Sequence, residues 1–348
     1  MKNNISFWGM ATLTCFIFGA CATSSVSLQV LKPAQITLPS YVQKVAVINR
    51  SLPSKEEKVN NIIEGVFSGE GLFVDREASK KCIDGMLNFM VNSPRLKAVE
   101  PVNIDLRGTG TAEFPMPLDW TTVEKICKDN GCDALLSLET FDSDKRVSTR
   151  FENKTKSENG QNIPYTQWFA RMDMQINAGW RIYDPKQKQV IFKDVLVDTR
   201  SWNTDALVEK EALSKLPQPR NATIDAGYFA GEQTGFRISP AWIYVSRSYY
   251  VRGNDQLKQT KRFVRANKWE EASKIWTSCL NDPKRKAAGR ACYNLALAAE
   301  MDGDLAKGVE MAKKAYTQYG NKKARYYMNI LENRQMDAQK LKEQMNAK

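Results

Sequence analysis

Short apolar runs and longer amphipathic stretches alternate along the first part of the chain. Residues 44–50 are a β-branched run between polar residues, and such a run predicts a buried strand. Cys82 and Met86 fall on one face of a helix that the spacing predicts over residues 76–92. Pro94 should end that helix, because the residue before a proline disfavours helical geometry.

A second helix is predicted between two further apolar runs. Thr121 and Glu124 have the spacing of a capping box, and Gly131 suits the left-handed end of a helix. The runs at residues 96–100 and 134–141 predict strands on either side of this helix. The order strand–helix–strand–helix–strand predicts a small layered α/β domain.

The most regular alternation in the chain predicts a β-hairpin. Apolar residues occupy every second position from Met172 to Ile182, as in a strand with one buried face. A turn around residues 184–186 leads to a second strand, predicted over residues 189–197. Residues 145–161, by contrast, contain almost no apolar residue and predict a mobile loop.

The stretches that follow have helical character up to the end of this domain. Residues 206–216 and 222–235 predict helices. Ser239-Pro240 predicts the start of a third helix, since proline suits the first helical position. The aromatic residues of this helix, beginning at Trp242, are expected to pack two domains together. We place the first domain, with an α+β or α/β fold, at residues 41–252.

From Gly253 onward helix formers dominate, and the sequence repeats itself. Residues 267–272 correspond to residues 303–308, and residues 291–295 correspond to residues 324–328. The first correspondence is offset by 36 residues and the second by 33. These offsets lie on either side of the period of about 34 residues that is typical of tetratricopeptide repeats. The pattern therefore predicts an all-α, tetratricopeptide-like domain over residues 253–348.

The first residues predict export. Lys2 is followed by an apolar stretch that ends at Phe18, and two small residues stand before Cys21. A positive start, a short apolar core and small exit residues are typical of a cleaved signal peptide, whereas a spanning helix needs about 20 apolar residues. We expect residues 1–20 to be removed as a signal peptide and residues 21–40 to form a tether.

Residues 18–21, Phe-Gly-Ala-Cys, resemble a lipobox, in which the peptidase cuts before a cysteine that becomes acylated. Phe18, in place of the usual leucine, resembles the looser lipoboxes of Bacteroidota. The resemblance implies that Cys21 is lipidated and holds the protein to a lipid bilayer. Because no acidic residues follow Cys21, it also implies the periplasmic face of the outer membrane. The alternatives are an ordinary signal peptide with a chance cysteine, or an anchor helix.

Composition narrows the classes of function. The 348-residue chain has a formal net charge of +12, and its basic residues are spread along it. For an exported protein, this charge favours anionic lipids or acidic glycans over nucleic acid as partners. Alternatively, the charge only makes the surface basic and soluble. The absence of histidine excludes Ser-His-Asp and Cys-His nucleophilic sites and histidine-bound metals. We therefore expect no metal, no cofactor and no enzymatic activity. Cys279 and Cys292 are either a disulfide between neighbouring helices or buried thiols.

Three segments in this order resemble an uncharacterised family of Bacteroidota lipoproteins: Val45 to Arg50, Ser239 to Trp242, and Asn267 to Trp269. The α/β half is also similar in pattern to the small domain shared by curli-secretion lipoproteins, the translocation protein TolB and lipoprotein activators of penicillin-binding proteins. The resemblance implies a cell-envelope location and this architecture, and it implies no reaction.

The leading hypothesis is a non-enzymatic scaffold that binds protein partners through its tetratricopeptide-like region. The candidate contact residues are Trp269, Trp276, Tyr293, Asn294, Tyr326, Lys313 and Lys314. Alternatively, the repeat packs only on its own α/β domain, and its basic residues, Lys322 and Lys323 included, are a solvated face. Two other functions remain open. One is a secretion or channel component, for which only residues 171–199 qualify as a membrane-crossing hairpin. The other is an envelope glycan enzyme that uses a pair of carboxylates.

Overall fold

The computed structural model describes residues 22–53, 69–110 and 112–345. These residues form two compact units. The helical unit contains the described residues up to Gln29 together with Tyr244–Met336, and the sheet unit contains Val30–Ile243 together with the described residues from Asp337 onward. The chain is therefore mixed α/β, with a β-rich first part and a helical later part.

The sheet unit is built on a five-stranded mixed sheet with the order β3-β2-β4-β5-β6. The strands are β2 (Lys44–Asn49), β3 (Lys97–Val99), β4 (Ala134–Glu158), β5 (Gln161–Asp184) and β6 (Gln189–Ala206). β2 is parallel to both of its neighbours, and the pairs β4–β5 and β5–β6 are antiparallel. The predicted strands and the predicted β5–β6 hairpin are therefore present, although β3 is shorter and β4, β5 and β6 are longer than predicted.

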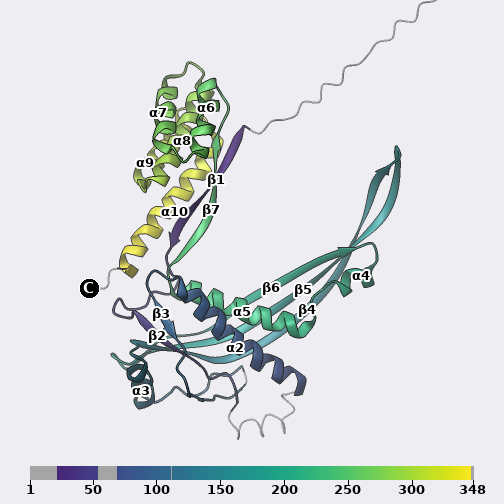
Figure 1. The fold of residues 1–348 in the computed structure, drawn as a ribbon, viewed down its shortest axis with the longest axis vertical. Helices are drawn as coiled ribbons and strands as arrows, with labels where there is room; N and C mark the ends of the chain where they lie inside the picture. Colours follow the sequence, from purple (N-terminus) through teal and green to yellow (C-terminus); the bar gives the residue numbers. More distant parts are fainter. Residues whose placement is uncertain (1–21, 54–68, 111, 346–348) are drawn as a thin grey trace, which may run out of the picture. The chain divides into compact units, whose positions relative to one another are not determined.

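Helices cover both faces of this sheet. They are α2 (Gly69–Val91), α3 (Trp120–Asn130), α4 (Glu209–Ser214) and α5 (Pro219–Ile238). Val45 and Val47 pack with α2 and α5 on one face, while Ala46 and Ile48 pack with α3 on the other (Figure 1). This is why β2 is apolar at every position from Val45 to Ile48 rather than at every second one. Asp119, not Thr121, caps α3, because its carboxylate accepts the backbone N–H of Thr122.

Two segments that the sequence assigned to other states are strands. Residues 21–40 were expected to be a tether, and the sequence from Ser239 was expected to be a helix. Instead β1 (Thr23–Lys32) and β7 (Ala241–Tyr250) form a two-stranded sheet. The β7 residues alternate between exposed and half-buried, which is strand periodicity, so its aromatic residues do not form a helical stripe. The backbone N–H of Val251 donates to the carbonyl of Ala22, at 3.0 Å, where the two strands meet.

The expected mobile loop at residues 145–161 is also wrong, because it is the end of a long hairpin. β4 and β5 remain paired from Leu135 and Tyr183 to Glu158 and Gln161. β6 pairs with β5 only as far as Trp168. We call residues 151–168, the part of the hairpin from the last pair with β6 outward, the arm; Figure 1 shows it extending past the other strands of the sheet. Asn159 and Gly160, with φ of 53° and 80°, form its two-residue turn.

The helical unit contains α6 (Asp255–Arg265), α7 (Trp269–Ser278), α8 (Arg285–Met301), α9 (Leu305–Thr317) and the first part of α10 (Lys322–Met345). Its core includes Trp276 and a run of small residues on α8 that lets neighbouring helices approach closely. Gly303, at φ +80°, makes the turn between α8 and α9, as the sequence predicted. None of the helices in the described ranges is long and apolar enough to cross a membrane.

Candidate functional site

Three of the candidate contact residues are interior residues of the helical unit. Trp276 is fully buried and its indole N–H donates to Thr260, at 3.0 Å. Tyr293 is 5% exposed. The buried Asn294 amide accepts the N–H of Tyr250 at 2.7 Å and donates to its carbonyl at 2.8 Å, which attaches β7 to α8. Because these side chains are already enclosed, the prediction that they contact a partner is not supported by their placement.

The other four candidates lie at the surface. Tyr326 is 72% exposed on α10, and Lys313 is exposed on α9. Trp269 and Lys314 are half-buried, and the Trp269 ring packs against Trp276 with ring centroids 6.3 Å apart. A partner-binding role for these four residues stays a prediction. Cys21, the expected lipidation site, lies outside the described residues.

A buried carboxylate, Glu300, joins three elements of the helical unit. Its oxygens accept from Arg247 on β7 at 2.9 Å and from Arg334 on α10 at 2.7 Å, and the Tyr327 hydroxyl donates to it at 2.5 Å. Burial alone would raise the pKa of Glu300, but these hydrogen bonds outweigh burial and lower it. A carboxylate with every oxygen occupied holds helices together and is not available as a general base.

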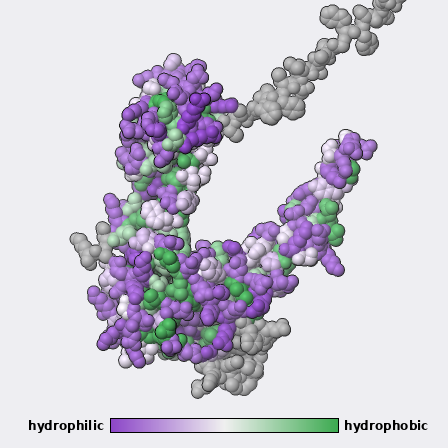
Figure 2. All heavy atoms as spheres, in the orientation of Figure 1, coloured by the Kyte–Doolittle hydropathy of each residue, from purple (hydrophilic) through white to green (hydrophobic). Residues whose placement is uncertain are grey.

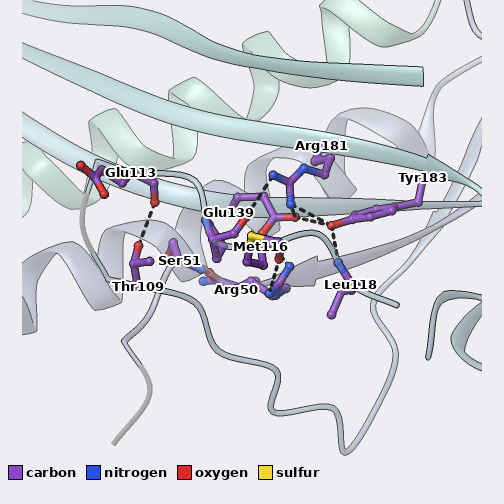
Figure 3. Close-up of polar contacts among 11 residues, drawn as sticks. Arg50, Ser51, Thr109, Glu113, Met116, Leu118, Glu139, Arg181 and Tyr183 are labelled. Atoms are coloured by element: carbon purple, nitrogen blue, oxygen red, sulfur yellow. Dashed lines mark hydrogen bonds and ion pairs between the residues drawn. The ribbon is translucent and has the colours of Figure 1, made fainter. Parts of the chain in front are cut away.

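The sheet unit contains a similar cluster around Glu139 (Figure 3). The side chain of Glu139 has no exposed surface and pairs with Arg50 at 2.9 Å and Arg181 at 3.2 Å. The Tyr183 hydroxyl donates to the same carboxylate at 3.0 Å, and the backbone N–H of Leu118 donates to that hydroxyl, also at 3.0 Å.

The two arginines of this cluster also bind the chain segment before α3. Arg50 donates to the carbonyl of Met116 and Arg181 donates to the carbonyl of Pro115. The network therefore fixes residues 115–118 against the sheet. It does not leave the free, paired carboxylates that glycoside hydrolysis requires.

The described cysteines are unpaired thiols, and the acidic residues do not gather into a metal site within the described ranges. Cys82, Cys127, Cys132, Cys279 and Cys292 are all free, so Cys279 and Cys292 are buried thiols in this structure. Burial raises the pKa of Cys292 to about 11 and that of Cys127 to about 12, which keeps both protonated at neutral pH. Within the described ranges, no group of three or more cysteine, aspartate or glutamate side chains is placed to hold a metal ion.

The helical unit has a basic cavity of about 460 Å³, which we call the basic pocket. It is lined by Tyr250, Arg285, Lys286, Gly289, Arg290, Tyr319, Gly320, Asn321 and Lys322. Four of these residues are cationic and none is acidic. The sequence indicated Lys322 only as one of several C-terminal basic residues of a solvated face. The pocket instead joins segments from β7, α8 and the α9–α10 turn, which no local pattern brings together.

The basic pocket is partly preorganised. The Arg290 guanidinium stacks over the Tyr250 ring, 5.1 Å from its centroid, and donates to the carbonyl of Arg252. Arg285 donates to the carbonyl of Gln318. Lys286 and Lys322 are exposed and form no ion pair with the part of the chain that the structure describes. The pocket can therefore receive an anion without first breaking a salt bridge.

Two family comparisons bear on this architecture. Residues 42–250, more than half of the chain, match the family described as Domain of unknown function (DUF8603). The chain belongs to this family. Residues 258–333 match a second one, described as Domain of unknown function (DUF6340). The DUF8603 match contains the complete five-stranded sheet, and the DUF6340 match contains α7, α8 and α9. Membership in a family without an assigned reaction agrees with the sequence resemblance to an uncharacterised family.

Similarity to proteins of known role is slight. No curated protein matches the chain. The solved structures include a dodecamer of a PelC variant from Paraburkholderia phytofirmans, with 11% identity and a TM-score of 0.21 over 60% of this chain and 96% of that one. They also include a putative neuraminyllactose-binding hemagglutinin homolog from Helicobacter pylori, with 10% identity and a TM-score of 0.18 over 58% of this chain and 86% of that one. At these TM-scores neither structure carries a functional argument.

Proposed function

We propose that this protein is a cell-envelope lipoprotein, anchored through acylated Cys21, that acts as a non-enzymatic interaction or assembly module. The support for anchoring is the signal-like start of the sequence and the small residues before Cys21. β1 begins at Thr23, only two residues later, so an anchor at Cys21 would hold the folded body close to the membrane surface. The proposed address is the periplasmic face of the outer membrane.

The observation that carries the interaction role is the arm, because its two faces differ in chemistry. Directly paired residues of an antiparallel hairpin share a face. One face carries uncharged residues only: Phe151, Asn153, Thr155, Ser157, Asn162, Pro164, Thr166 and Trp168. The other face carries every charge of the arm: Glu152, Lys154, Lys156 and Glu158.

The uncharged face of the arm is exposed and has an aromatic base. The Phe151 ring is 58% exposed and packs against Trp168, with centroids 5.2 Å apart. A hairpin that extends beyond its own sheet and carries an exposed aromatic ring is typical of an interaction surface, since it has no core of its own to cover. Figure 2 shows the arm as largely hydrophilic with a hydrophobic stretch along it.

The helical unit supplies a second proposed surface. We propose that it is tetratricopeptide-like and that exposed Tyr326, with Lys313 nearby in sequence, contributes to partner binding. Helical repeats commonly bind peptides or helices on one face. Support for this part is limited to the repeat spacing and to the exposure of these side chains.

A secretion-channel role is a weaker candidate, and the arm is the observation that favours it. Each of its strands, residues 151–158 and 161–168, has eight residues, close to the roughly 9–11 that a membrane-crossing strand needs. However, one arm face carries Glu152, Lys154, Lys156 and Glu158, and the other is rich in Asn, Ser and Thr, so neither face is apolar enough for lipid contact. We therefore favour protein contact.

Two measurements test the proposal. Mass spectrometry of the protein from envelope membranes should find an acylated Cys21 as the new amino terminus; a bare Cys21, or residues 1–20 still attached, would remove the anchoring claim. A photo-crosslinking residue at Thr155, on the uncharged arm face, should capture a defined protein neighbour. The matched control is the same residue at exposed Thr121 on α3. Identical products from both positions, or lipid alone, would count against the interaction role.

A further inference from the structure

The basic pocket lies beside the point where the chain enters the helical unit. The carbonyl of Ala22 accepts the N–H of Val251 at 3.0 Å, and the preceding residue, Tyr250, lines the pocket. Cys21 is bonded to Ala22, and one residue adds about 3.8 Å of chain. If Cys21 is acylated, as the proposed function states, the pocket is therefore held within a few residues' reach of the bilayer surface.

Basic residues stand at the positive, amino-terminal ends of the two helices that border the pocket, where acidic residues are normally favoured. The positive end of a helix normally carries acidic or capping side chains. α8 begins with Arg285 and Lys286 and has no side-chain cap and no acidic residue in its first turn. α10 begins with Lys322 and Lys323, also with no acidic residue in its first turn. Three of the four cationic side chains of the cavity, Arg285, Lys286 and Lys322, therefore stand at these two helix starts.

This arrangement is unfavourable for the isolated protein and favourable once an anion is bound. Like charges at a helix start repel one another and the helix dipole, and a bound phosphate relieves both effects. The Tyr250 and Tyr319 rings supply apolar walls, and Arg290 is held over the Tyr250 ring. Lys286 and Lys322 are exposed and free to reach a ligand. The chemistry is that of a phosphate site with a partly apolar rim.

We propose that the basic pocket binds the phosphate of an anionic lipid headgroup in the same bilayer that holds the acylated Cys21. This inference rests on the proposed anchoring. Lipidated proteins commonly combine acyl chains with a basic surface, because each basic residue near an anionic leaflet adds attraction. The pocket would fix how the helical unit meets the membrane, a role that the acyl chains alone do not provide.

Vesicle binding tests the pocket without the acyl chains. The mature chain, residues 21–348, carrying Cys21→Ala is mixed with vesicles of phosphatidylcholine with and without phosphatidylglycerol. We expect preferential binding to the anionic vesicles, and a loss of about tenfold or more in the double variant Lys286→Gln/Lys322→Gln. The matched control, Lys258→Gln/Lys307→Gln, removes two exposed lysines of α6 and α9 outside the pocket lining and should bind within about twofold of the parent.

Each other outcome has a defined meaning. Equal losses in the two double variants would overturn the pocket as the site, leaving only general surface charge. Inorganic phosphate that raises the melting temperature of the parent but not of Lys286→Gln/Lys322→Gln, without any vesicle preference, would show a free-anion site and overturn the lipid source. Because Cys21 is absent from this assay, failure here is distinct from failure of the anchoring claim, which mass spectrometry of Cys21 decides.

Discussion

Glu300 is a buried charge in the interior of the helical unit. Its side chain has no exposed surface and pairs with Arg247 and Arg334. Glu300→Gln keeps the shape but leaves two arginines without a counter-charge, so the unfolding free energy at about pH 7 should fall by about 3 kcal/mol. Urea unfolding measures this. Glu332→Gln, at an exposed position on the same helix as Arg334, should change it by less than about 0.5 kcal/mol.

The same residue predicts a dependence on pH. The folded-state pKa of Glu300 is lowered, so its contribution is complete above the ordinary glutamate pKa of about 4.3 and is lost as the pH falls below that value. The stability difference between the parent and Glu300→Gln should therefore shrink as the pH is lowered from about 6 toward 3. A difference that stays constant over this range would contradict the role given to the charge.

For Asp75 on α2 we expect stability to change with pH in the opposite direction. Burial raises its pKa to about 6, and the acidic neighbours Asp142 and Asp144 add to the shift, against a hydrogen bond from Ser143 of 2.6 Å. The folded state therefore keeps this proton up to a higher pH than the unfolded state does. As a result, the unfolding free energy falls as the pH rises from about 4 to about 6.

Asp75→Asn removes this penalty and should stabilise the protein at neutral pH. We expect a gain of about 1 kcal/mol at about pH 7.5, reduced for the partial exposure of the group, and no gain near pH 4. Thermal melting at the two pH values measures it. Asp129→Asn, at an exposed position on α3, serves as the control and should show no such pH-dependent gain. Equal effects of Asp75→Asn at both pH values would exclude titration of Asp75 as the cause.

Residue patterns predicted the buried character of the helical unit better than its surface. Trp276, Tyr293 and Asn294 were predicted to be contact residues of the repeat region, yet all three side chains are buried in the helical unit. The amide of Asn294 satisfies both backbone groups of Tyr250, a partner 44 positions away along the chain. Side-chain exposure depends on such distant partners, which the repeat spacing does not reveal.

At the scale of elements, α2 and α5 depend on glycine for their close approach. A Cβ atom at Gly231 would lie 1.9 Å from the carbonyl oxygen of Cys82. Since backbone must move to relieve this contact, Gly231→Ala should lower the unfolding free energy by about 3 kcal/mol. Gly308→Ala on α9 is the control, because its added carbon comes no closer than 3.4 Å to another atom. Chemical denaturation of both variants measures the difference, and equal effects would contradict tight α2–α5 packing.

The arm was predicted wrongly for a physical reason. Strand and helix patterns arise from a buried face, and the arm has none, so its polar sequence resembles a loop. The signal that would have found it is Asn159-Gly160, the residue pair that two-residue hairpin turns favour. In β1, the alternating Val26, Leu28 and Val30 were the corresponding signal within the expected tether.

At the scale of the whole molecule, the sequence predicted that an α/β part precedes a helical part. It did not predict that each compact unit is built from two separate segments of the chain. Strand–helix alternation followed by a helical repeat predicted an α/β part before an all-α part. The sequence did not indicate that residues near both ends join units built largely from other segments. β1 and the last part of α10 are examples, because their partners depend on tertiary contacts rather than on local periodicity.

The last turn of α10 tests this long-range closure within the sheet unit. Gln344, 1% exposed, accepts the N–H of Ala34 at 2.9 Å and donates to its carbonyl at 3.0 Å. Gln344→Ala leaves two buried backbone groups unpaired and should cost about 2–4 kcal/mol. Hydrogen exchange should then accelerate at Ala34 and its neighbours but stay unchanged in α8. Gln339→Ala makes the same change at an exposed position of the same helix and should leave exchange as it is. Unaltered protection of Ala34 in Gln344→Ala would mean that the chain end does not stabilise the sheet unit.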